Sequence, residues 1–349
     1  MAQAGLGARE FVRRERAQCS ATLNGTRQMT LCLSEADVRR VLPMADLIGA
    51  MEGVLAAFSA GAVVQPVRPV VEIGPASFFA AMPGLVREPA AMGAKLVTVM
   101  GANQARGLPT HRASILLLDA ETGALLALMD GRLITEMRTA AVSAVSVKHM
   151  ARADADVLAI LGSGVQARSH FTALSLVRGF REVRAWSPTA AHLRAFAGEC
   201  GVRACEGAEA AVAGAGVIVL ATDSTTPAIA DGWVAEGAHV ISVGACRPSH
   251  REMDPALVAR ARVVVDARAS AFQESGDIVM GLAEGRFGRE HVTAELGEIV
   301  AGRAVGRASD REITVFKGLG LAVEDLAAAR LVLERARARG IGVEIDLGG

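Results

Sequence analysis

The chain has 349 residues, of which 51% are hydrophobic and 21% charged, so it is long enough for two domains and has a globular composition. Lys and Arg total 37, as do Asp and Glu, which leaves no net charge to attract nucleic acid or an anionic membrane. The longest apolar runs have the length of strands, so no membrane-spanning helix is predicted. Five cysteines lack metal-ligand spacing, and the N-terminal region lacks the apolar core of a signal peptide. We therefore expect a cytoplasmic protein with no metal site.

The first part of the chain predicts helices followed by an antiparallel sheet. Residues 1–28 are expected to be a poorly ordered extension, with Met29 as an alternative start. The capping box Ser34–Asp37 begins one helix, and Met44–Ser59 has the pattern of a second. Strand-like patterns follow at Val67–Ile73, Ser77–Met82, Ala94–Val99, Ile115–Leu118 and Leu125–Met129. The last two flank a hairpin loop that contains glycine.

A helix predicted from Thr135 to about Met150 leads to the most informative segment of the chain. Val157–Leu161 has the pattern of a buried parallel strand, and it ends in the turn Gly162-Ser163-Gly164. Helix-like spacing follows over Val165–Leu176. In a dinucleotide cradle the first glycine permits the turn, the second lets the backbone approach a pyrophosphate, and the helix N-terminus attracts the anion. An ordinary strand-to-helix turn is the alternative interpretation.

Strands then alternate with helical segments. The predicted strands are Val183–Trp186, Val217–Ala221, Val240–Val243 and Val263–Asp266, with a helix over Ala190–Ala197. Gly302–Asp310 is expected to be a loop, and Leu321–Arg339 an amphipathic helix that returns to the first part of the chain. The predicted fold class is therefore α/β, with a Rossmann-type doubly wound parallel sheet after an N-terminal α+β domain.

Several short blocks, in this order, resemble the ornithine cyclodeaminase/mu-crystallin family. They are Gln65–Arg68, Lys95–Val97, Met129–Gly131, Arg138–Ala141, Gly162–Ala167, Val243–Ala245, Glu274–Asp277 and Gly318–Gly320. The stretch from Val243 to Glu252 is most similar to the mu-crystallin-like ketimine reductases. The resemblance implies a substrate-binding and dimerisation domain (29–135 and 320–349), completed by the C-terminal helix, and a dinucleotide-binding domain (136–319). It also implies a homodimer, with nicotinamide cofactor and substrate between the domains.

Three cations interrupt apolar sequence in the first half of the chain, which is unusual for solvated charges. By resemblance, Arg68 and Lys95 are catalytic residues that hold the carboxylate of a small imino or amino acid, and Arg138 contacts both substrate and cofactor. Burial and nearby cations would lower the pKa of Lys95 and make it a candidate proton donor. Structural ion pairs are the alternative interpretation. Met82 and Cys246 are expected to line the substrate pocket.

The remaining expected cofactor contacts cluster at the glycine turn and the carboxyl ends of strands. They are Arg138, Thr139, Gly162, Ser163, Gly164, Val165, Gln166, Ser187, Pro188, Thr189, Thr222, Val243, Gly244 and Leu319. An acidic residue after the second strand would favour NADH, but Ser187-Pro188-Thr189 contains none, so NADPH is preferred over NADH. Arg184 or Arg194 could meet the 2′-phosphate.

Cys246 decides between branches of the family. The deaminating members resemble this stretch but carry Asp there for proton transfer, which favours reduction of a preformed C=N bond in this chain. The predicted function is NAD(P)H-dependent reduction of a small 2-imino acid. Two alternatives remain. One is other amino-acid chemistry of the family (cyclodeaminase, alanine or N-alkyl amino acid dehydrogenase, amine–oxoacid synthase), and the other is a non-enzymatic binding protein. Glu274 and Asp277 are expected to cap loops, and Phe78 to be core.

Overall fold

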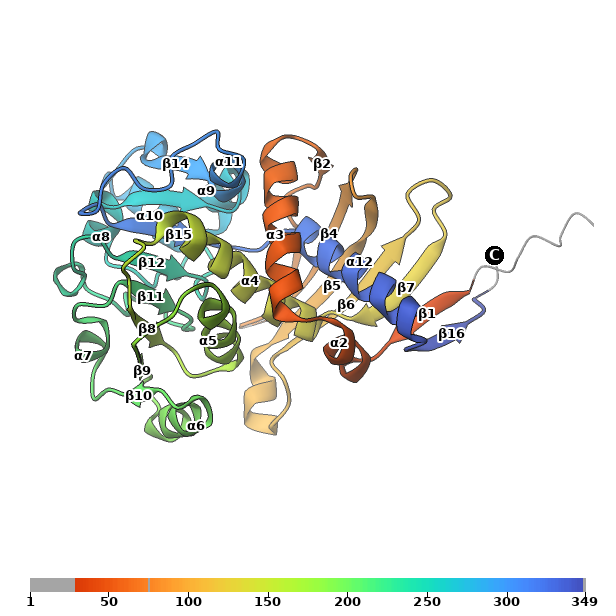
Figure 1. Cartoon of the computed structure of the whole chain (residues 1–349), viewed down its shortest axis with the longest axis horizontal. Helices are drawn as coiled ribbons and strands as arrows, with labels where there is room; N and C mark the ends of the chain where they lie inside the picture. Colours follow the sequence, from red (N-terminus) through yellow and green to blue (C-terminus); the bar gives the residue numbers. More distant parts are fainter. Residues whose placement is uncertain (1–28, 75, 348–349) are drawn as a thin grey trace, which may run out of the picture.

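The computed structural model describes residues 29–74 and 76–347, and the extension expected at 1–28 lies outside them. Two sheets stand side by side, with helix α4 (Arg132–Met150) running between them (Figure 1). Among the described residues no single helix has the length and hydropathy of a membrane span. Helices α2 (Glu35–Val41) and α3 (Met44–Ser59) together have that length and hydropathy, but they are bent by 88° relative to each other.

The first sheet contains the strands of the N-terminal region and one from the C-terminus. Its order is β16-β1-β7-β6-β5-β4-β2, and β3 also pairs with β4. The strands are β1 (Thr30–Leu33), β2 (Val63–Val64), β3 (Val70–Gly74), β4 (Ser77–Val86), β5 (Ala91–Met100), β6 (His111–Leu118), β7 (Leu125–Asp130) and β16 (Val343–Ile345). The expectation of an antiparallel sheet was wrong at one point, because β1 runs parallel to β7.

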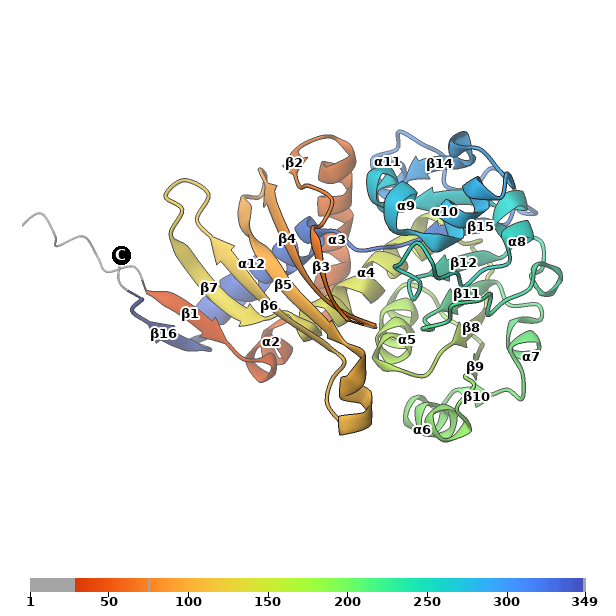
Figure 2. The same ribbon diagram turned by 180° about the vertical axis from the view of Figure 1, so that it is seen from behind.

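Among the described residues, helices cover one face of this sheet and leave the other uncovered. Helix α12 (Ala322–Arg339) packs on α3, β4 and β5, which confirms that the last helix returns to the first part of the chain. The predicted capping box is present, since Ser34 accepts a hydrogen bond from the Asp37 amide and caps α2. Figure 2 shows the opposite face of the strands without a covering helix among the described residues. A short 3₁₀ helix, η1 (Gly101–Arg106), joins β5 to β6.

The second sheet is fully parallel and has the order β10-β9-β8-β11-β12-β15-β13-β14. Its strands are β8 (Val157–Leu161), β9 (Glu182–Trp186), β10 (Arg203–Ala204), β11 (Val217–Leu220), β12 (His239–Ser242), β13 (Arg262–Val265), β14 (Val292–Glu295) and β15 (Thr314–Lys317). Alternate residues of β8 enter two different cores: Leu158 and Ile160 one, Ala159 and Leu161 the other. Both faces are therefore covered, which confirms the predicted doubly wound sheet.

The helices of this region follow the strands in alternation. They are α5 (Val165–Val177), α6 (Ala190–Cys200), α7 (Ala208–Val212), α8 (Pro255–Arg260), α9 (Arg268–Glu274), α10 (Gly276–Ala283) and α11 (Leu296–Val300), with 3₁₀ turns η2 (Asp231–Trp233) and η3 (Arg289–His291). Helix α4 begins three residues earlier than expected, where the Asp130 carboxylate accepts the Leu133 N–H. The predicted domain boundary at residues 135/136 thus falls inside α4, and the division into two domains stays a prediction.

Candidate active site

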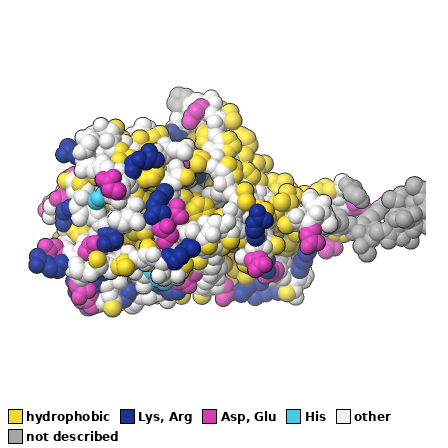
Figure 3. All heavy atoms as spheres, turned by 90° about the horizontal axis from the view of Figure 1, so that it is seen from above, with side chains coloured by type: hydrophobic (Ala, Val, Ile, Leu, Met, Phe, Trp, Pro, Cys, Tyr) yellow, Lys and Arg dark blue, Asp and Glu magenta, His cyan; other side chains and the backbone are white. Residues whose placement is uncertain are grey.

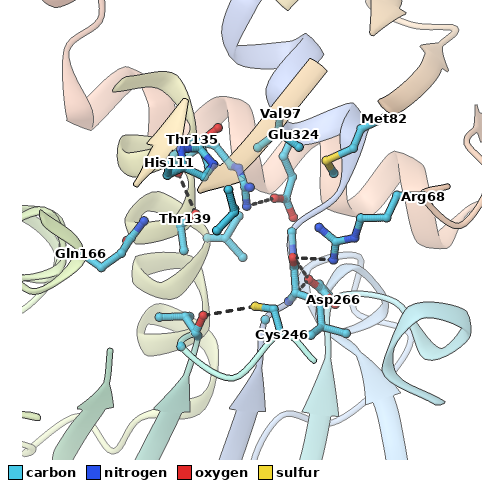
Figure 4. A pocket seen from close by; sticks show the side chains of 18 of the residues that line it. Arg68, Met82, Val97, His111, Thr135, Thr139, Gln166, Cys246, Asp266 and Glu324 are labelled. Carbon is cyan, nitrogen blue, oxygen red and sulfur yellow. Dashed lines mark hydrogen bonds and ion pairs between the residues drawn. The ribbon is translucent and has the colours of Figure 1, made fainter. Parts of the chain in front are cut away.

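A cavity of about 300 Å³ lies where the first sheet, α4 and the carboxyl edge of the parallel sheet meet (Figure 4). It brings together many of the residues that the sequence singled out. These are Arg68, Met82, Lys95, Arg138, Thr139, Gln166, Val243, Gly244, Cys246 and Leu319. The rest of the predicted cofactor set (Gly162, Ser163, Gly164, Val165, Ser187, Pro188, Thr189 and Thr222) is not part of its lining.

Strand register explains how the first sheet supplies its share of the lining. Met82 and Lys95 are cross-strand partners in β4 and β5, so their side chains leave the same face. That face also carries Phe78, Val97 and His111, all of which line the cavity. Phe78, expected to be core, is thus also a wall of the cavity, and His111 is a lining residue that the sequence did not indicate.

A buried charge cluster joins three elements on one side of the cavity. The Lys95 ammonium lies 2.6 Å from an Asp325 carboxylate oxygen and donates to the Thr135 hydroxyl at 3.3 Å. Arg138 donates to Asp325 at 3.1 Å and to Glu324 at 3.0 Å. Burial lowers the pKa of Lys95 to about 8, opposed by Asp325 and assisted by Arg138, so Lys95 remains mainly protonated at neutral pH. The sequence did not indicate Glu324 or Asp325.

Arg68 is held from the other side of the cavity. Its Nε and Nη2 each donate to one carboxylate oxygen of Glu274 at 2.8 Å, and Nη2 also donates to the Leu319 carbonyl at 3.0 Å. Glu274 ends α9, so the expectation that it caps a loop was wrong: its carboxylate is engaged by a guanidinium instead. Asp277 does cap a loop, because it accepts the N–H groups of Glu252 and Met253. Arg68 makes these hydrogen bonds to described residues through Nε and Nη2, so Nη1 can donate to a ligand.

The Gly318-Leu319-Gly320 turn is fixed by a buried carboxylate that the sequence did not indicate. Asp266, which follows β13, accepts the N–H groups of Leu319 at 2.5 Å and of Gly320 at 2.6 Å. Gly320 has a φ of +84°, and a Cβ there would lie closer than 3.0 Å to the Arg138 guanidinium. Position 320 therefore requires glycine both for its backbone and for the close approach of Arg138.

The glycine turn after β8 fits a dinucleotide. Gly162 has a φ of +124°, and a Cβ there would collide with the Ala221 carbonyl. Gly164 is the N-cap residue of α5, no side chain caps that helix, and the space beside its Cα is open. The free N–H groups can therefore donate hydrogen bonds to a phosphate. Gly244 packs directly on Thr222, as expected where two strand ends border a nicotinamide ring.

At the ribose end of the predicted cofactor site, a hydrogen bond already joins two of the predicted residues. The Ser163 hydroxyl donates to the Ser187 hydroxyl at 2.9 Å, which ties the glycine turn to the end of β9. Pro188 and Thr189 are exposed just before α6. Arg184 already donates to Glu182 and to the Ala213 carbonyl, so its guanidinium is engaged elsewhere.

The surroundings of three further lining residues define their hydrogen bonds and charge. Thr139, expected at a helix start, lies inside α4, and its hydroxyl donates to the Thr135 carbonyl at 2.7 Å. The Cys246 thiol donates to the Val243 carbonyl at 3.4 Å and lines the cavity as expected. Burial, reinforced by Lys95 and Arg138, lowers the pKa of His111 to about 4, so it is neutral at pH 7.

The sequence profile of the ornithine cyclodeaminase/mu-crystallin family matches residues 28–340 of this chain. The chain belongs to this family. It is 43% identical over 294 residues to ketimine reductase mu-crystallin of Rattus norvegicus, a match that covers 82% of this chain and 91% of that protein.

Two solved structures share the fold over nearly their whole length. The Δ1-pyrroline-2-carboxylate reductase of Thermococcus litoralis, in complex with NADH and L-proline, is 36% identical with a TM-score of 0.88, covering 90% of this chain and 100% of that one. An archaeal alanine dehydrogenase dimer with bound NAD is 32% identical with a TM-score of 0.87, covering 92% and 100%.

Proposed function

We propose that this family member reduces the C=N bond of a small 2-imino acid, such as a cyclic imine carboxylate, to the amino acid, with NAD(P)H as reductant. The observation that carries the proposal is the placement of Arg68, Lys95 and Arg138 in one cavity that also reaches the carboxyl edge of the dinucleotide-type sheet. The relatives named for ketimine and pyrroline-2-carboxylate reduction support it.

In this proposal, different residues of the cavity bind different parts of the substrate. Arg68 Nη1 and the Lys95 ammonium bind the substrate carboxylate, because both are cationic donors that line the cavity. Phe78, Met82 and Val97 form an apolar wall for the carbon skeleton. These contacts orient the substrate C2 toward the edge where Val243 and Gly244 lie, and orientation of this kind supplies much of the rate in a hydride transfer.

The cofactor residues follow the same geometry. The turn at Gly162–Gly164 and the N-terminus of α5 would hold the pyrophosphate, and Thr222, Val243, Gly244 and Leu319 would border the nicotinamide, with Arg138, Thr139 and Gln166 between cofactor and substrate. The bound cofactor supplies the hydride. The preference for NADPH stays a prediction: it rests on the absence of an acidic side chain at Ser187–Thr189, and separate titrations with NADPH and NADH test it.

The first experiment is an assay of purified protein with NADPH or NADH and a panel of cyclic 2-imino acids, followed by the absorbance of the reduced nicotinamide. We expect rapid oxidation with one imine. A protein that instead reduces NAD with ornithine or alanine, or couples an amine to a 2-oxo acid, belongs to the deaminating or coupling branches. One that binds NADPH but reduces no imine is a binding protein.

A homodimer through the uncovered sheet face is the finer proposal on assembly. Leu96 and Leu128 project from that face with 38% and 39% exposure, and Val71 extends the same surface. In Figure 3 hydrophobic side chains gather along the edge of the half of the molecule that carries this sheet, although charged side chains are present on both halves. The archaeal alanine dehydrogenase, which is described as a dimer, supports this proposal.

Sedimentation analysis tests the dimer. We expect Leu96→Glu and Leu128→Glu to produce monomers at concentrations where the wild type is dimeric, because each buries a charge in the proposed interface. Val305→Glu, in an exposed position of the loop after α11, is the matched control and should leave the mass unchanged. Wild-type mass for Leu96→Glu and Leu128→Glu would place the interface elsewhere.

We also propose a cytoplasmic location, supported by free thiols at Cys32, Cys200, Cys205 and Cys246, and cell fractionation tests it.

A further inference from the structure

One carboxylate oxygen at the cavity has no partner. Glu324, in the first turn of α12, accepts hydrogen bonds at Oε2 from Arg138 at 3.0 Å and from the Leu321 amide at 3.1 Å. Its other oxygen, Oε1, is buried and has no hydrogen-bond partner among the described residues. The side chain is 1% exposed and lines the cavity beside Val97 and Met82 (Figure 4). A buried polar atom left unpaired is costly, so Oε1 is placed to meet a group that enters the cavity.

The surroundings of Glu324 favour its neutral form. Burial is the largest influence and raises the pKa of Glu324 to about 7; Arg138 and the Leu321 amide oppose this rise, and Asp266 and Asp325 add to it. The charged and titratable groups that face this corner come from four elements and two connecting segments: Arg138 of α4, Lys95 of β5, His111 of β6, Asp325 of α12 itself, Arg68 before β3 and Asp266 after β13. Near neutral pH a substantial share of Glu324 therefore carries a proton on a carboxyl group that borders the cavity.

Lys95 is less suited to release a proton. Its ammonium lies 2.6 Å from Asp325, so a neutral lysine would leave that buried carboxylate with Arg138 alone. It would also forfeit the cation that binds the substrate carboxylate. Glu324 has the opposite balance, because the carboxylate formed when it releases a proton is already bonded to Arg138 through Oε2.

We propose that Glu324 is the general acid that protonates the substrate nitrogen during imine reduction, while Lys95 stays cationic. The Glu324 O–H bond breaks and an N–H bond forms, with the C=N π electrons moving on to nitrogen. The hydride that forms the new C–H bond at C2 comes from the reduced nicotinamide, which is oxidised as the imine is reduced. Solvent then returns the proton to Glu324. This step rests on the proposed reductase function.

The test compares two substrates in Glu324→Gln. One is a cyclic 2-imino acid whose nitrogen must gain a proton, and the other is its N-methyl iminium analogue, which needs none. For the first we expect kcat/KM to fall by roughly 10²–10⁴-fold, the usual contribution of a general acid, and for the second to stay at the wild-type value. The loss with the first should shrink as pH falls, because solvent then supplies the protonated imine.

Matched variants separate chemistry from structure. Glu334→Gln makes the same change on an exposed turn of α12 and should behave as wild type. Glu324→Asp keeps an acid and should retain a rate that declines at high pH. Cofactor affinity, measured by nicotinamide fluorescence, should be unchanged in Glu324→Gln. Infrared difference spectra should show the loss of one protonated carboxyl band in that variant, a readout independent of turnover.

Each other outcome has a distinct meaning. Equal losses of activity with both substrates at every pH would overturn the proposal, because Glu324 would then be a structural residue. Unchanged activity of Glu324→Gln with the protonatable imine would also overturn it. If the wild type rejects the bulkier N-methyl compound, the pH dependence of the loss decides in its place. A wild type that reduces neither compound contradicts the reductase function itself.

Discussion

Replacement of Arg68 by lysine tests whether the guanidinium fork holds the substrate carboxylate. The variant keeps the positive charge, but lysine cannot bond both Glu274 oxygens and the Leu319 carbonyl while still presenting a donor to the cavity. The change removes one charge-assisted hydrogen bond to the substrate, of about 1.5–3 kcal/mol. We therefore expect KM to rise roughly 10- to 150-fold, with a smaller effect on kcat.

Steady-state kinetics with the imine of highest activity measure this effect. Arg268→Lys is the matched control, because Arg268 makes the same two-pronged contact with Glu298 away from the cavity. It should leave KM unchanged. A wild-type KM in Arg68→Lys would refute the assignment of Arg68 to the substrate carboxylate, and a rise of the same size in Arg268→Lys would show that the change acts through general stability.

Three further predictions follow from the same contacts. Gly162→Ala places a Cβ against the Ala221 carbonyl, so calorimetry should show a lower Tm and fluorescence titration weaker NAD(P)H binding; unchanged affinity would contradict the dinucleotide site. Lys95→Met should lower kcat/KM on the order of 10²-fold, and full activity would dismiss Lys95 as a substrate contact. Because the variant leaves the buried Asp325 charge without its lysine partner, the free energy of unfolding in urea should fall by about 3 kcal/mol. Because the pKa of Glu324 is raised to about 7 from 4.5, the native state binds the extra proton in that window, so wild-type stability should fall by roughly 2–4 kcal/mol relative to Glu324→Gln between pH 4.5 and 7. Parallel unfolding curves for wild type and Glu324→Gln across that range would disprove the raised pKa.

Local patterns predicted most of the fold because most elements are specified by nearby residues. The capping box at Ser34 and the glycine turn after β8 each act over a few positions, and both are present as expected. Strands β1 and β16 were missed for the opposite reason. β16 has three exposed residues and is defined by pairing with Cys32 and its neighbours, more than 300 positions away. The parallel pairing of β1 with β7 likewise has no local signal.

The site was predicted as far as residue type signals chemistry. Cations in apolar sequence, as at Lys95, indicate function directly. Glu324 and Asp325 gave no such signal, because acidic residues in the first turn of a helix ordinarily complement its dipole at the surface. Their burial follows from where α12 docks, against β4 and β5. Two adjacent acids beginning an alanine-rich amphipathic helix are the signal that could have located them.

Hydride transfer to carbon C2 of an imino acid is the central claim, and isotopic labelling tests it most directly. Purified protein is incubated with a cyclic 2-imino acid and NAD(P)H carrying deuterium in both hydrogens at nicotinamide C4, and the product is analysed by mass spectrometry and NMR. We predict the saturated amino acid with one deuterium, located at C2. Oxidation of the nicotinamide without a labelled amino acid, or no oxidation with any imine while the cofactor binds, would contradict the account.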